Sequence, residues 1–278
     1  REHVHLLEPV DGRCLTPDFR VLDEAEAQLL RERALERTME TFYQDIENGD
    51  EDAAQLAGTL GAGRDDRALT ALVLELHSKI QSHPYPEKWL RAAAESWRQL
   101  PSSLADSDYG RTVMEDTVRR ALFWAGQLER AVAAMEDCEP VYKANAAQFL
   151  AAAAELRRYE QASQEGWDAM GRVQPVLQRA GAVKNGENDE AKAAAKAVRE
   201  KYKKAKEEMT APYLVTEREH LEDLQAAAPS MLALLRLTER FSQRYQVEKV
   251  RRNAMDFSDQ EHYAVTLLCG QDDEPTDL

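Results

Sequence analysis

Helix-forming residues at helical spacing are the feature of this 278-residue chain that most limits its fold. Alanine, leucine, glutamate, arginine and glutamine dominate the sequence, and all of them are favourable inside helices. With 12 glycines and 10 prolines, the chain has too few turn residues for a β-rich protein of this length. No segment alternates apolar and polar residues in the way that is typical of a strand. The sequence therefore predicts an all-α fold, arranged as an irregular multi-helix bundle.

Caps and breaks place the individual helices. Asp23 is followed three residues later by Glu26, the spacing of a capping box, so a helix should run from there to about Glu47 with Leu29 on its buried side. Pro86 suits the first turn of another helix, because no backbone donor is needed at that position. Other helices are expected over 67–81 and 109–136, from 141 towards 179 with a kink near Gly166, Gly171 or Pro175, over 189–209, from about 216, over 229–252 and from about 256.

The two longest of these segments, 109–136 and 141–179, are joined by a short connection, which predicts a long antiparallel helical hairpin. The chain divides into three parts on this basis. Residues 1–22 form an extended segment with Pro9, Gly12 and Pro17, residues 23–252 are helical, and residues 253–278 leave the bundle and end in a frayed tail. The first residue is not methionine, so we expect both ends to be cut points in a longer protein.

Charge and cysteine content limit the classes of function. The net charge of −15 argues against wholesale wrapping of nucleic acid, although a local basic face can still bind phosphate. Cys14, Cys138 and Cys269 are odd in number and far apart, which predicts free thiols in a reducing, cytoplasmic compartment. No apolar run reaches the roughly 18 residues of a membrane span, so no membrane role is expected.

Motifs for catalysis and cofactor binding are missing from the sequence. There is no G-x-x-x-x-G-K-[ST] phosphate loop, and the glycine cluster GTLGAGRDDR (58–67) predicts a mobile turn rather than a nucleotide site. No H-E-x-x-H or G-x-S-x-G motif occurs, and the six histidines are scattered. We therefore expect no catalytic residues, no metal site and no cofactor in this chain.

A basic stripe is the clearest candidate binding feature. Its members follow steps of four, three, four and three, which places them within about 80° of one helix face. They are Lys192, Lys196, Arg199, Lys203 and Lys206. From Lys184 to Lys206 there are eight basic and four acidic residues, a local charge of +4. Such a row can follow a phosphate backbone. The alternative is a solvated helix face with Glu/Lys pairs.

The segment RRNAMDFSDQEHYAVTLL (251–268) carries a second pattern. Asp256 is expected to be a helix N-cap, with Asp259 at the third helical position and Phe257 as an apolar anchor. By itself, this pattern indicates only that a helix begins there.

Three segments resemble one known family. Residues 251–268 resemble the stretch before the Walker B strand of UvrD-like superfamily 1 helicases, and their EHYA part (261–264) is similar to the A subunit of AddAB (RexAB) helicase–nucleases. Residues 17–36 resemble the stretch after the T-x-H-S motif of that subunit. Residues 61–90 are similar to its pattern of Asp-Arg, an apolar helix and Ser-His-Pro-x-Pro-x-x-Trp-Leu. Gln260 departs from the family, which usually carries leucine there.

The resemblance implies a place within a larger enzyme. Residues 23–252 would form subdomain 1B, a helical insertion in the first motor domain, and residues 253–278 would begin the return into that domain. The parent would bind ATP and Mg²⁺, unwind and degrade DNA from broken ends during repair, and work with a companion B subunit. This chain would be an accessory DNA-handling region without catalytic residues of its own.

On this interpretation, duplex or forked DNA would contact the stripe together with Arg64 and Arg67 on the glycine-rich turn. Two alternatives stay open. The long acidic helices could mainly be a protein-interaction scaffold that docks the partner subunit, or the chain could be an unrelated helical enzyme.

Overall fold

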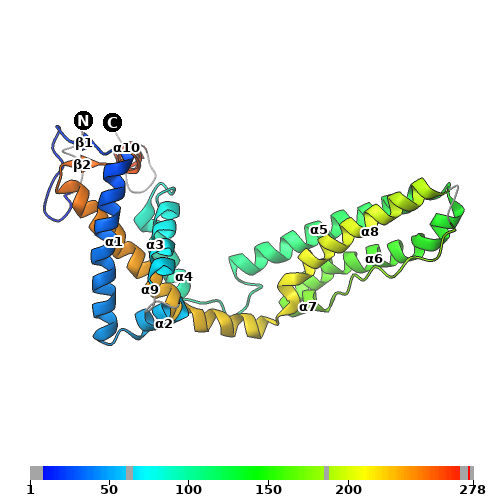
Figure 1. Ribbon diagram of the computed structural model, residues 1–278. Helices are drawn as coiled ribbons and strands as arrows, with labels where there is room; N and C mark the ends of the chain where they lie inside the picture. Colours follow the sequence, from blue (N-terminus) through cyan, green and yellow to red (C-terminus); the bar gives the residue numbers. More distant parts are fainter. Residues whose placement is uncertain (1–8, 61–64, 185–187, 270–274, 276–278) are drawn as a thin grey trace. The chain divides into compact units, whose positions relative to one another are not determined.

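The computed structural model describes residues 9–60, 65–184, 188–269 and 275 (Figure 1). These residues are mostly helical, which confirms the predicted fold class. They form two compact units. Unit 1 comprises 1–100 and 225–278, and unit 2 comprises 101–224. The chain therefore leaves unit 1 once and returns to it inside a single helix, α9 (Glu217–Val250).

Unit 1 is built around α1 and the C-terminal part of α9. Its elements are β1 (Arg20–Val21), α1 (Glu24–Glu47), α2 (Glu51–Thr59), α3 (Arg67–Ile80), α4 (Pro86–Arg98), β2 (Ala254–Met255) and α10 (Phe257–Cys269). Asp23 caps α1 as predicted, accepting a hydrogen bond from the Glu26 N–H at 2.8 Å. Leu30, Phe42, Val73 and Phe241 are all nearly fully buried in the main core of this unit.

Leu29 was predicted to be buried, and this is wrong, because it is 49% exposed. The buried side of α1 follows the row Leu30, Ala34, Thr38 and Phe42, and Leu29 lies one residue, or about 100°, away from that row. A pair of neighbouring leucines does not reveal which member faces the core.

Two short strands were not predicted. β1 and β2 pair in parallel, with Arg20 opposite Ala254 and Val21 opposite Met255. Strands of two residues are too short to show an alternating pattern, which is why the sequence does not reveal them. Their pairing joins the N-terminal segment to the connection between α9 and α10.

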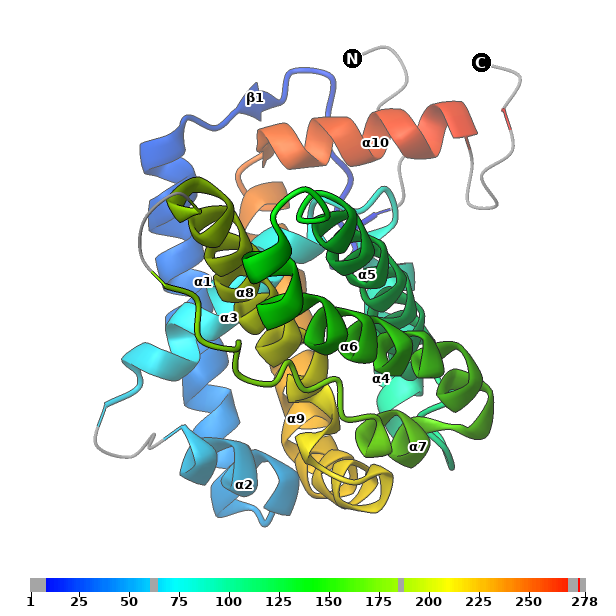
Figure 2. The same ribbon diagram turned by 90° about the vertical axis from the view of Figure 1, so that its right-hand side faces the viewer.

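Unit 2 contains the predicted long antiparallel hairpin, formed by α5 (Asp108–Ala133) and α6 (Glu139–Glu165), with α8 (Asp189–Thr210) packed against both (Figure 1, Figure 2). Small side chains let the helices approach closely, because Ala121, Ala125, Ala152 and Ala153 are almost fully buried. The unit is completed by α7 (Trp167–Arg172), the 3₁₀ helix η2 (Ala211–Leu214) and the first turns of α9.

Two helix predictions need correction. The helix expected from 141 towards 179 is broken at Gly166, whose φ of 109° is open to glycine but strained for other residues, and α7 ends at Arg172. Conversely, the two helices expected from about 216 and over 229–252 are one continuous helix, α9, with Pro229 inside it. A proline removes one helical hydrogen bond, yet the helix continues beyond Pro229 into the buried residues Ser230, Ala233 and Leu234.

A buried ion network anchors α10 to α9. Lys249 is 3% exposed, and its Nζ lies 2.7 Å from the Asp259 carboxylate, 3.1 Å from the Asp256 carboxylate and 4.3 Å from the centre of the Tyr245 ring. Asp256 accepts a hydrogen bond from the Asp259 N–H, and Asp259 accepts one from the Asp256 N–H, both at 3.0 Å. This reciprocal cap begins α10.

The two carboxyl groups of this network titrate differently. Burial opposes ionisation of Asp256, but the Lys249 charge and the hydrogen bonds to its carboxylate outweigh burial and lower its pKa. Burial and the neighbouring Asp256 charge raise the pKa of Asp259. The buried Lys249 ammonium thus binds two carboxylates. Without Lys249 the carboxylates would have no counter-ion, and without the carboxylates the buried ammonium would have none.

Lys249→Met is expected to destabilise unit 1 by roughly 3 to 5 kcal/mol, because it leaves two buried carboxylates facing each other. Urea unfolding at neutral pH measures this loss, and Lys249→Met combined with Asp259→Asn should recover part of it. Lys79→Met is the matched control, since Lys79 lies on the surface beside Glu75 and its loss should cost no more than about 0.5 kcal/mol. Equal stability of the Lys249 and Lys79 variants would contradict the role given to the network.

His77 makes unit 1 sensitive to acid. Its ring packs on Phe241, with centroids 4.9 Å apart, and burial lowers the pKa of His77 from 6.5 to about 4. The folded state therefore binds fewer protons than the unfolded chain between these pH values. The free energy of unfolding must fall as the pH decreases through this window.

Lowering the pH from 7.5 to 5 should reduce the free energy of unfolding by about 2 kcal/mol because of His77. His77→Phe should not show this loss, because phenylalanine does not titrate, and it keeps the aromatic packing. Comparing urea unfolding of both proteins at the two pH values checks the prediction. A parallel pH dependence in the variant would show that another group is responsible.

Candidate nucleic-acid interface

The basic stripe lies on α8, which alanines and long polar side chains favour as a helix. One face of α8 is buried in unit 2 through Ala195, Tyr202, Ala205 and Met209. The Tyr202 hydroxyl also donates a hydrogen bond to the Pro175 carbonyl at 2.6 Å. The stripe borders this buried face, so its members differ in how far they reach solvent.

Two members of the stripe, Lys196 and Lys203, are exposed, and we call them the exposed-lysine pair. Lys192 and Lys206 are half-buried, and the Lys192 Nζ lies 3.4 Å from the Val183 carbonyl. The exposed-lysine pair is separated by two turns of one helix face, a spacing that suits contacts with a phosphate backbone.

Arg199 has contacts of a different kind from the lysines. Its Nε donates to the Asn145 side chain at 2.9 Å, one terminal nitrogen donates to the Gln178 carbonyl at 2.6 Å, and the guanidinium lies 5.0 Å from the centre of the Phe149 ring. Burial lowers the pKa of Arg199. Its main contacts hold α8 against α6 and the segment after α7, which the regular spacing of the stripe could not reveal.

Lys201 and Lys204 are also exposed on α8 but belong to another face. Lys201 lies about 160° and Lys204 about 100° around the helix from Lys203. They were not part of the predicted site, although their positions could have been read from the same helical periodicity. They therefore provide a charge-matched comparison on the same helix.

The other predicted contacts lie in unit 1. Arg67 is the first residue of α3, its side chain is 90% exposed, and it forms an ion pair with Asp65 at 2.7 Å. Arg64 lies outside the described residues. In the predicted motif after α9, Asp256 and Asp259 form the reciprocal cap of α10.

Phe257 was expected to be an apolar anchor and is instead 70% exposed. The residue that enters the core at this point is Met255, which is 3% exposed beside Leu15 and Phe19. The turn into α10 directs the second of the two apolar side chains outward, and this could not be inferred from their order in the chain.

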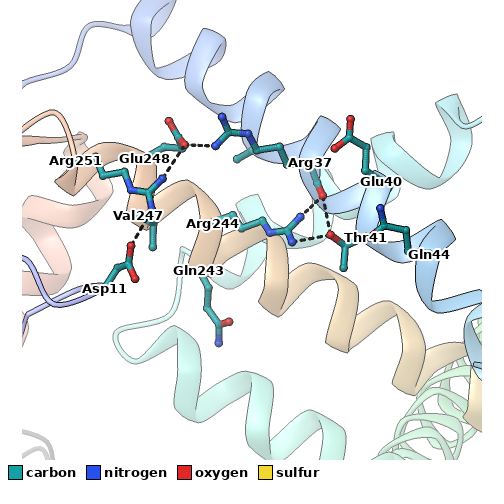
Figure 3. Close-up of a pocket in the computed structure, with 11 residues that line it drawn as sticks. Asp11, Arg37, Glu40, Thr41, Gln44, Gln243, Arg244, Val247, Glu248 and Arg251 are labelled. Carbon is teal, nitrogen blue, oxygen red and sulfur yellow. Dashed lines mark hydrogen bonds and ion pairs between the residues drawn. The ribbon is translucent and has the colours of Figure 1, made fainter. Parts of the chain in front are cut away.

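Unit 1 also contains a groove between α1 and α9 that the sequence analysis missed. Its volume is about 580 Å³, and Arg37, Arg244 and Arg251 lie along it together with Asp11 and Glu248 (Figure 3). The signal that could have found it is the four-residue spacing of Arg236, Arg240 and Arg244 on α9. We call it the α1–α9 groove.

Within the described residues, no three histidine, cysteine or acidic side chains gather so as to hold a metal ion. No described helix is both long enough and apolar enough to span a membrane.

Comparison with known proteins gives a consistent result. No protein-family model matches the chain. It is 30% identical over 286 residues to the A subunit of the ATP-dependent helicase/nuclease of Desulforamulus reducens, an alignment that covers 95% of this chain and 21% of that protein. The proteins of the same name from Acetivibrio thermocellus and Ruminiclostridium cellulolyticum are 29% and 27% identical, covering 91% and 93% of this chain and 21% of each relative.

The chain thus spans about a fifth of the length of the curated relatives that it matches. Several such relatives align with nearly all of its residues. The chain is therefore homologous to one region of the A subunit of ATP-dependent helicase/nucleases.

Proposed function

We propose that this chain is an accessory DNA-handling region of an ATP-dependent DNA helicase–nuclease that acts on broken DNA ends, and that it guides duplex or forked DNA past the motor. The observation that carries the proposal is the homology to helicase/nuclease A subunits over more than nine-tenths of the chain. The exposed-lysine pair supports it, because it offers positive charge in a chain with a net charge of −15.

The proposed contacts are with the phosphate backbone. Lys196 and Lys203 would bind phosphates directly, and the half-buried Lys192 and Lys206 would add positive potential beside them. Arg67, which is exposed at the start of α3, would make a separate contact from unit 1, and Arg64 belongs to the same proposed set. Contacts of this kind position a strand without reading its sequence.

The chemistry would lie elsewhere in the parent protein. The chain has no phosphate loop, so ATP and Mg²⁺ would be bound by other parts of the parent. Residues 23–252 would correspond to subdomain 1B, and 253–278 to the start of the return into the motor domain. Within that assignment, unit 2 is a compact portion of the insertion, formed by residues 101–224.

A partner protein is the second element of the proposal. The relatives carry the name of an A subunit, which implies a companion subunit for them. Exposed apolar side chains on unit 2, including Phe123 and Leu150, favour a protein contact there in addition to DNA. Retention of the companion B subunit by this chain in the absence of DNA would support that scaffold role.

Reversing the charge of the exposed-lysine pair, Lys196→Glu with Lys203→Glu, is expected to weaken binding of forked DNA. It should also lower the slope of log affinity against log salt by about 2, since each lost phosphate contact contributes about 0.9. Fluorescence anisotropy over a salt series measures both quantities.

Lys201→Glu with Lys204→Glu is the matched control, because it makes the same change in net charge on another face of α8. A smaller effect is expected from this pair. If both pairs weaken binding equally, only the overall charge matters, and if the exposed-lysine pair has no effect, α8 is ordinary surface.

A further inference from the structure

A row of ion pairs joins α9 to α1 and α2, and we call it the ladder. In the α1–α9 groove this row is interrupted at one position. Successive charged residues on α9, four apart, meet α1 and α2 in reverse order, so α1 and α9 run antiparallel. Arg236 pairs with Asp50 at 3.2 Å, Arg240 pairs with Asp45 at 2.5 Å, and Glu248 pairs with Arg37 at 2.6 Å. Each of these side chains meets an opposite charge.

Arg244 is the exception in this ladder. Its terminal nitrogens donate to the Thr41 hydroxyl at 2.7 Å and to the Arg37 carbonyl, both of which are neutral acceptors (Figure 3). Among the residues that the structure describes, no carboxylate lies within 4.0 Å of its guanidinium nitrogens. Thr41 occupies the position at which an acid would complete the ladder.

The surroundings of Arg244 add to this imbalance. Burial lowers the pKa of Arg244, and so do the nearby charges of Arg240 and Arg37, which together outweigh Glu40 and Asp45. Glu248, the main acid of the groove, is shared by Arg37 at 2.6 Å, Arg252 at 2.6 Å and Arg251 at 3.9 Å. Arg251 also pairs with Asp11 at 2.9 Å, so two carboxylates are shared by three guanidinium groups.

Arg244 also has hydrogen-bonding capacity left. A guanidinium carries five N–H donors in one plane, and the two contacts above use only part of this set. The groove beside it, of about 580 Å³, is in the size range of ligand sites. Arg37 and Arg251 also line it, paired with Glu248 and Asp11, and Glu40 is its third acid. A planar donor fork with further arginines nearby is the arrangement that binds phosphate oxygens.

We propose that the α1–α9 groove is a phosphate-binding site in which Arg244 contacts the backbone of a nucleic-acid strand and Arg37 and Arg251 flank it. The choice of nucleic acid as the source of the phosphate rests on the proposed function. The site itself is separate from the exposed-lysine pair, since it belongs to unit 1 and α8 belongs to unit 2.

The test uses the whole chain carrying Lys196→Glu and Lys203→Glu, so that remaining binding does not depend on that pair. The probe is a fluorescein-labelled oligodeoxythymidine of about 12 nucleotides, within the roughly 4–16 nucleotides that small binding domains cover. Thr41→Asp should complete the ladder, and Arg244→Gln removes the charge. Each should weaken oligonucleotide binding by about tenfold or more at low salt, and inorganic phosphate should compete.

Thr41→Ser is the control, because it keeps the hydroxyl that Arg244 contacts and should bind like its background. Thr41→Asp also guards against misfolding, since the added ion pair should leave the thermal unfolding temperature unchanged or raise it. Binding that is unaffected by both Thr41→Asp and Arg244→Gln would overturn the site. Thermal protection by inorganic phosphate without oligonucleotide binding would overturn the assignment to a nucleic-acid strand. The DNA-handling proposal is tested separately, in protein whose groove is intact. It fails if reversing the charge of the exposed-lysine pair does not change the binding of forked DNA over the salt series.

Discussion

The antiparallel pairing of α1 with α9 is the interaction on which unit 1 depends. Beneath the charge ladder, Leu30 and Phe42 of α1 and Leu237 and Phe241 of α9 belong to one apolar core. Burial of such side chains supplies most of the stabilisation, while ion pairs with exposed members contribute little individually. The ladder therefore matters chiefly because it fixes how the two helices align, and a one-turn shift would place Arg240 against the neutral Thr41 and Arg244 against Arg37, so that two arginines would face each other.

The same helix carries the network that orders the end of the chain. Lys249 lies one residue beyond the ladder, and because successive residues of a helix point about 100° apart, it faces the interior while Glu248 faces Arg37. Asp256 and Asp259 can bind Lys249 only if the chain turns after β2, which also allows β1 and β2 to pair. The start of α10 is thus held against α9 by side chains of this chain. Gln246 adds a hydrogen bond to the Tyr263 hydroxyl at 2.7 Å.

Local signals were enough to predict most helices, and tertiary contacts explain the exceptions. The cap at Asp23, the proline at Pro86 and the start at Asp189 are determined within one helical turn, so the sequence predicts them well. Pro229 and Gly166 carry similar helix-breaking signals but have opposite outcomes. Whether a helix continues through such a residue depends on the packing on either side, which is not encoded near the break.

The candidate sites show the same division between local and tertiary information. The spacing of the stripe correctly places its members along one side of α8. Their surroundings differ, however, because Arg199 packs on Phe149 while Lys196 and Lys203 reach solvent. The difference comes from α6 and the segment after α7, which cover only one edge of the stripe. The α1–α9 groove depends still more on tertiary structure, because Thr41 and Arg244 are 203 residues apart. A threonine in a helix has no special meaning by itself, and its significance arises only from the acids and arginines that occupy the equivalent positions along the ladder.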